Sequence, residues 1–77
     1  MTATIYFSDS SKENLVIHNL TAITARNVNP RIRDKNYSPK NFHVFTPSDD
    51  ESYAFVGDKE IVGIPGNRIL HVTITDD

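Results

Sequence analysis

The chain has 77 residues, a net charge of −2 and no cysteine, which excludes disulfides, cysteine-based zinc sites and thiol catalysis. This length predicts a single domain, residues 1–77, in which only about 60% of the unfolded surface becomes buried on folding. The missing cysteines, the lack of a signal-peptide pattern and the absence of a run of about 20 apolar residues predict a cytoplasmic protein without a membrane segment.

The N-terminal third predicts strands, because apolar and polar side chains alternate along residues 2–8. The polar stretch 9–13 is typical of a hairpin loop, and residues 14–18 then return as a second strand. Residues 20–25 fit an extension of this strand, a separate strand or a short helical turn. The periodicity does not distinguish these three alternatives.

Most of the positive charge lies in residues 26–41. This segment carries five basic residues against one acidic residue, a net charge of +4, whereas the rest of the chain has three basic and nine acidic residues, a net charge of −6. Two prolines, several asparagines and few apolar residues indicate a long basic loop or excursion. A loop of this length in so small a domain is either functional or partly disordered.

The C-terminal half predicts a four-strand meander with short turns. Pro65 and Gly66 suit the central positions of a type II turn, in which proline fixes φ and glycine supplies a positive φ. The four predicted strands are residues 42–46, 51–56, 60–64 and 69–75.

Together these patterns predict an all-β domain of five or six antiparallel strands. We expect a small barrel or curled sheet, in the form of an Sm- or SH3-like roll, because closure hides strand edges that a flat sheet leaves exposed. The alternative is a two-layer sandwich. No internal repeat is visible in the sequence.

No motif in the chain predicts catalysis. His18, His43 and His71 lie in predicted strands without close pairing, which favours solvent-facing histidines over a metal site. The acidic run 49–51 lacks the 12-residue calcium-binding frame and is typical of a solvated turn. Serine-nucleophile and phosphate-binding patterns are missing as well. We therefore expect no enzymatic activity, no metal, no cofactor and no small-molecule substrate.

Two parts of the chain carry a family resemblance: residues 4–9 with 15–23, and residues 53–72. They resemble short, uncharacterised β-rich proteins of Gram-positive bacteria and their prophages. The resemblance leaves out residues 26–41 and transfers no catalytic or binding residue. It implies a cytoplasmic, phage- or prophage-related accessory protein.

We expect a non-enzymatic interaction module that binds another protein, or a second copy of itself, through strand edges and the basic segment. The alternative function is a nucleic-acid-binding β-barrel, in which basic side chains contact phosphates and Tyr37 or Phe42 stacks on an unpaired base. The candidate binding residues are Arg26, Arg31, Arg33, Lys35, Tyr37 and Lys40.

Overall fold

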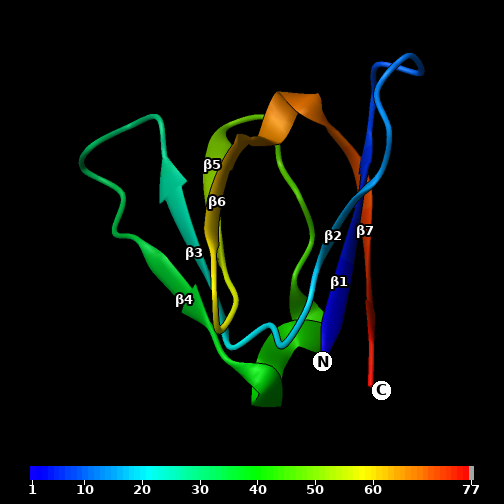
Figure 1. The fold of residues 1–77 in the computed structure, drawn as a ribbon. Helices are drawn as coiled ribbons and strands as arrows, with labels where there is room; N and C mark the ends of the chain where they lie inside the picture. Colours follow the sequence, from blue (N-terminus) through cyan, green and yellow to red (C-terminus); the bar gives the residue numbers. More distant parts are fainter. Residues whose placement is uncertain (77) are drawn as a thin grey trace.

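The computed structural model, which describes residues 1–76, consists of two antiparallel sheets, so the all-β prediction is confirmed (Figure 1). The three-stranded sheet has the order β2-β1-β7, and the four-stranded sheet has the order β4-β3-β5-β6. The strands of the first are β1 (Thr2–Phe7), β2 (Leu15–Ile17) and β7 (Ile69–Thr75). Those of the second are β3 (Ala22–Asn27), β4 (Lys35–Tyr37), β5 (Glu51–Val56) and β6 (Ile61–Pro65).

Alternation along the strands places one apolar face of each sheet in a shared core. The two sheets lie on opposite sides of the molecule in Figure 1, and residues from both form one buried cluster. Because β-strand side chains alternate in direction, every second residue of β1, β3 and β5 enters this core. The buried apolar residues are Ala3, Ile5, Ile17, Leu20, Ile23, Ala25, Phe42, Tyr53, Phe55, Ile64 and Ile69.

The first forty residues form two hairpins of the same geometry. Residues 1–17 and 21–37 have the same succession of strand, turn and strand. The cross-strand pairs also repeat after 20 residues: Ala3–Ile17 corresponds to Ile23–Tyr37. Over residues 1–20 and 21–40 only one aligned pair, Thr4 and Thr24, is identical. The repeat is therefore one of backbone geometry, which explains why the sequence does not reveal it.

The basic segment 26–41 is not one long loop. Its first two residues end β3, and residues 28–34 form a tight hairpin loop that leads into β4. The 3₁₀ helix η1 (Pro39–Val44) begins within the last residues of the segment. Residues 20–25, which the periodicity left undecided, contain the start of β3. Pairing of β4 with β3 satisfies the backbone groups that a long loop would leave to water.

The strand predicted at residues 42–46 is wrong, because most of this segment belongs to η1. The backbone amide of Ser38 donates a hydrogen bond of 2.7 Å to Asn41 Oδ1, and Pro39 occupies the first helical turn, where its missing N–H costs nothing. Phe42 is buried and Phe45 is half-buried. Their spacing of three matches a 3₁₀ turn and places both rings against the core.

The C-terminal meander is also corrected. β5 and β6 pair within one sheet, but β7 pairs with β1 in the other sheet after the short 3₁₀ helix η2 (Gly66–Arg68). The predicted type II turn is wrong, because none of the glycines that the structure describes, Gly66 included, has a positive φ. A Cβ atom at Gly66 would overlap the carbonyl oxygens of Ser48 and Glu51, so glycine is required by close backbone packing.

Candidate functional site

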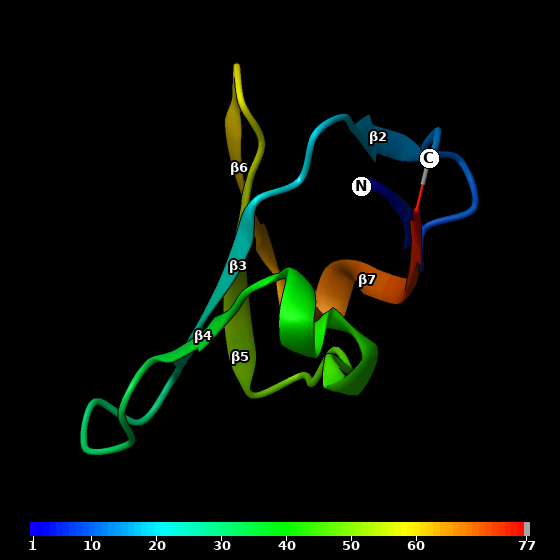
Figure 2. The ribbon, with the colours of Figure 1, turned by 90° about the horizontal axis from the view of Figure 1, so that it is seen from below.

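The β3–β4 hairpin has a loop that projects from the body of the domain and carries two of the basic residues, Arg31 and Arg33 (Figures 1 and 2). We call residues 28–34 the β3–β4 tip. Asn29 organises it: its Oδ1 accepts the backbone N–H of Arg31 at 3.0 Å, and its carbonyl oxygen accepts the N–H of Ile32 at 3.0 Å. A backbone bond of 2.9 Å from Val28 N–H to the Asp50 carbonyl oxygen fastens the base of the tip to the neighbouring segment.

Some of the six predicted binding residues form ion pairs within the domain, and others do not. Arg26 lies on β3 and forms an exposed ion pair of 3.3 Å with Asp34. Lys35 on β4 lies 3.8 Å from Glu51, whose carboxylate is nearly buried. Within residues 1–76, no ion pair is found for the remaining basic residues, Arg31 and Arg33 on the tip and Lys40 in η1.

The aromatic residues near the basic segment do not form a stacking platform. The rings of Tyr37 and Phe45 form a T-shaped contact at a centroid distance of 5.3 Å. Tyr37 also pairs across the sheet with the buried Ile23, so its side chain lies on the core side of the sheet. Phe42 is only 5% exposed. Phe42 is therefore buried and Tyr37 is half-buried, and neither is the fully exposed ring that favours stacking on an unpaired base.

Two exposed apolar residues of the tip were missed by the sequence reasoning. Val28 is 74% exposed and Ile32 is 45% exposed, on either side of Arg31. Both residues are visible in the sequence, where they count among the few apolar residues of the segment. The signal that could have indicated an interface is that both aliphatic residues lie among charged residues, in a loop whose solvation requires no aliphatic side chain.

The β1–β2 loop shows what this backbone geometry requires. Asp9 there takes the place of Asn29: it accepts the N–H of Ser11 at 3.0 Å on Oδ1, and its carbonyl oxygen accepts the N–H of Lys12. Residues 8–14 contain no apolar residue at all. The loop conformation therefore depends on an Asx residue at its second position, and Val28 and Ile32 are not needed to form it.

A network of hydrogen-bonded polar groups lies at the edge of the core near the β3–β4 hairpin. The backbone N–H of Ser48 donates to Tyr53 Oη at 2.7 Å, and that hydroxyl donates to Glu51 Oε1 at 3.0 Å. Burial, opposed by the Ser48 hydrogen bond and reinforced by Glu51, raises the pKa of Tyr53 to about 12. Lys35 adds a positive charge at the edge of the network. This role of Lys35 is structural.

The histidines lie apart. His18, His43 and His71 are all exposed, and His71 stacks on Tyr6 at a centroid distance of 4.3 Å. Among residues 1–76, no group of three or more His, Asp or Glu side chains is placed to hold a metal ion. None of the helices over the same residues has the length and apolar character to span a membrane.

The geometry therefore points to the β3–β4 tip as the candidate interface, with Arg31, Arg33, Val28 and Ile32 as its accessible side chains. No protein-family model, curated protein or solved structure matches this chain. The resemblance to prophage proteins stays a prediction.

Proposed function

We propose that the protein is a non-enzymatic interaction module whose β3–β4 tip binds an acidic protein surface with an apolar depression. The observation that supports this proposal is the exposed pair Val28 and Ile32 beside two arginines without ion-pair partners in residues 1–76. Aliphatic side chains gain free energy when a partner removes them from water, and arginine forms bidentate hydrogen bonds with carboxylates. Small interfaces of this kind concentrate their affinity in a few central side chains.

Photo-crosslinking tests this proposal. A benzophenone amino acid at position 32 is compared with the same group at position 12, the equivalent position of the other hairpin. We expect a protein adduct from position 32 alone, identified by mass spectrometry and then titrated as a purified protein. An adduct with a second copy of the chain would make the partner the protein itself. Equal adducts from both positions would contradict a tip-specific interface.

A loop exchange supplies the matched control. Residues 28–34 are replaced, position by position, with the residues found at 8–14. We expect the variant to fold, because both loops have the same geometry, and to lose the partner identified by crosslinking. Retained binding in a folded variant would place the interface elsewhere, for instance at a strand edge.

The second candidate function is nucleic-acid binding through Arg31 and Arg33, which the net charge of the segment favours. The inward placement of Tyr37 and the burial of Phe42 weigh against it. A fluorescence anisotropy titration with a single-stranded oligonucleotide at low salt distinguishes the two functions. Saturable binding that is lost in the Arg31→Ser, Arg33→Glu double variant would favour nucleic acid as the partner.

For the finer architecture, we propose an incompletely closed roll in place of an aligned sandwich. In support, η2, which joins β6 of one sheet to β7 of the other, has only three residues. The helix η1 also lies beside β4 at the edge of the four-stranded sheet. The cytoplasmic location and a phage-related role are retained as predictions, for which the neighbouring genes are the direct test.

A further inference from the structure

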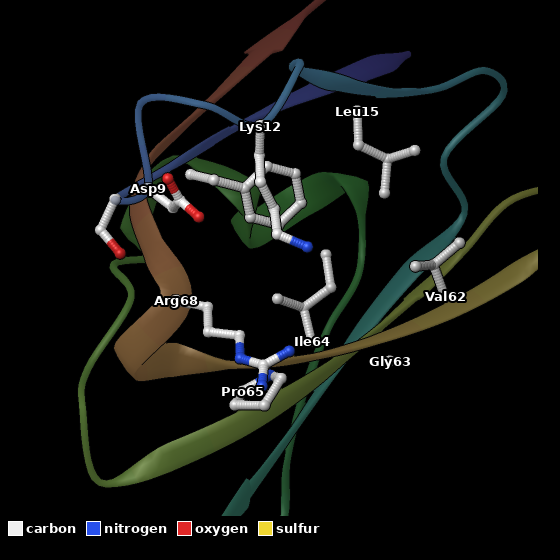
Figure 3. Close-up of a pocket in the computed structure, with 10 residues that line it drawn as sticks. Asp9, Lys12, Leu15, Val62, Gly63, Ile64, Pro65 and Arg68 are labelled. Carbon is white, nitrogen blue, oxygen red and sulfur yellow. The ribbon is translucent and has the colours of Figure 1, made fainter.

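A cavity of about 460 Å³ lies between the β1–β2 hairpin and β6 (Figure 3), and these elements are on the side of the molecule away from the β3–β4 tip in Figure 1. Its walls come from the end of β1, the loop that follows, β2, β6 and η2. The volume falls within the range of roughly 300–1,000 Å³ that is usual for small-molecule sites. This cavity is independent of the function proposed above.

The floor of the cavity is apolar. Ile64 is buried, while Phe7, Leu15 and Val62 are half-buried and line the space from both sheets. Figure 3 shows the side chains of Leu15 and Val62 on one side of the opening and that of Ile64 beneath Lys12. A hydrocarbon placed here removes apolar surface from water on the protein as well as on itself.

Two positively charged side chains line the cavity beside its apolar residues. Lys12 comes from the β1–β2 loop and Arg68 from η2, and both side chains extend into the space near Ile64 in Figure 3. A backbone hydrogen bond of 3.0 Å from Ser8 N–H to the Arg68 carbonyl oxygen joins the two elements. Neither cation has an ion pair within residues 1–76. Arg68 is therefore free to bind an anionic group, and Lys12 can do so while its charge also acts on the Asp9 carboxylate.

Among residues 1–76, Asp9 is the one acidic residue of the lining. Its Oδ1 already accepts hydrogen bonds from the backbone N–H and the hydroxyl of Ser11, at 3.0 and 2.8 Å. With Lys12, Arg68 and Asp9 together, the lining has a net charge of one positive unit. This net charge suits a single carboxylate better than a multiply charged phosphate.

We propose that this cavity binds a small monocarboxylate with an aliphatic body, the carboxylate held between Lys12 and Arg68 and the hydrocarbon on Phe7, Leu15, Val62 and Ile64. The compound is bound as a ligand and is not transformed. A compact ligand fits better than an extended peptide, because the lining wraps from the β1–β2 loop through η2 to β6 and Lys12 reaches across the opening.

The test is an NMR titration of the full chain with sodium decanoate below its micelle concentration. We expect saturable shifts of the methyl groups of Leu15, Val62 and Ile64, and affinity that falls with added salt. Decan-1-ol and decyltrimethylammonium should bind at least tenfold more weakly, which corresponds to about 1.4 kcal/mol. Absent shifts, or equal binding of the three compounds, would overturn the proposal.

Three variants sharpen this test. Lys12→Met and Arg68→Gln should each weaken decanoate binding about tenfold, because each removes a charged hydrogen-bond donor. Lys59→Met, which removes an exposed lysine outside the cavity, is the matched control and should leave the affinity unchanged. Asp9→Asn should tighten binding by removing a repulsive charge. A free-carboxylate peptide that bound more tightly than decanoate would overturn the assignment to a small molecule.

Discussion

The β1–β2 and β3–β4 hairpins have one backbone geometry and two different surfaces. The first is held to the domain by Ile5 and Ile17, both fully buried, and its loop borders the cavity beside η2. In the second, the corresponding residues are the smaller Ala25 and the half-buried Tyr37, and the loop extends away from the core. The difference teaches that two hairpins with the same strand pairing can differ in how deeply the side chains of their inner faces are buried.

The neighbouring strands extend this comparison. β7 lies beside β1 as β5 lies beside β3, so that Ala3 pairs with Ile74 and Ile23 pairs with Phe55. The first residue of each hairpin loop donates its N–H to the segment before that neighbouring strand: Ser8 to Arg68 and Val28 to Asp50. Two three-stranded units of like construction thus face one another, and β6 is the additional strand.

The largest expected effect comes from Ile17→Ala and Tyr37→Ala, which alter the same position of the two hairpins. Ile17→Ala should lower the free energy of unfolding by about 2–5 kcal/mol, because it leaves a cavity in the core. Tyr37→Ala should cost less than half as much, since its ring is only partly buried. Urea unfolding measures both values. Equal losses would mean that the second hairpin is held as firmly as the first.

Tyr53→Phe tests the polar network beneath the second hairpin. Removing the hydroxyl leaves Glu51 and the Ser48 N–H without their buried partner, which should cost about 1–3 kcal/mol of unfolding free energy. Tyr37→Phe is the matched control, because no hydrogen bond to its hydroxyl is found within residues 1–76 and its ring contact with Phe45 is retained. A smaller loss for Tyr53→Phe than for this control would remove the network from the explanation.

The same tyrosine predicts a loss of stability in alkali. The pKa of Tyr53 is about 12 in the folded protein against an ordinary value of 10, so the folded state holds this proton more tightly. Stability from this source is complete below pH 10 and falls as the pH rises toward 12. Thermal unfolding across this range should show a steeper decline for the wild type than for Tyr53→Phe. Parallel profiles would contradict the assignment.

A smaller effect is expected from Arg26→Ala. The ion pair of Arg26 with Asp34 joins β3 to the tip, but its side chains are 77% and 41% exposed. An exposed pair of this kind contributes less than about 1 kcal/mol, and added salt weakens it further. Tyr6, the equivalent residue of the first hairpin, has an uncharged side chain at ordinary pH and cannot form such a pair there. A loss that exceeds that of Tyr37→Ala would show that charge, and not packing, holds the second hairpin.

Much of the sheet structure was predictable, because alternation is a local signal. β1, β5 and β7 were predicted almost at their observed bounds for this reason. The predicted strand at residues 42–46 failed because Phe42 and Phe45 also satisfy the spacing of a 3₁₀ turn, and only the tertiary contacts of these rings distinguish the two.

The candidate site was predictable in location but not in composition. The excess of positive charge predicted the segment in which the exposed hairpin tip lies, yet the register of β3, β4 and β5 decides that Lys35 is directed toward Glu51 and Tyr37 toward Phe45. Such long-range pairings are not encoded in local spacing. Lys12 and Arg68 come together for the same reason: they are 56 positions apart in the chain, and the Ser8–Arg68 hydrogen bond joins the elements that carry them.

The finest test of the comparison uses Asp9 and Asn29, which have the same place in the two loops. The Ser11 hydroxyl, and then its backbone amide, hold the pKa of Asp9 below its ordinary value of 3.8. Because the folded pKa is depressed, the stabilisation is present above pH 3.8 and is lost as the pH falls through the folded value. The Ser11 amide should therefore shift in acid in an NMR titration, whereas the Arg31 amide, bound to uncharged Asn29, should not. Asp9→Asn should make the Ser11 amide as insensitive as that of Arg31. A Ser11 shift that survives this substitution would mean that a group other than Asp9 titrates in the loop.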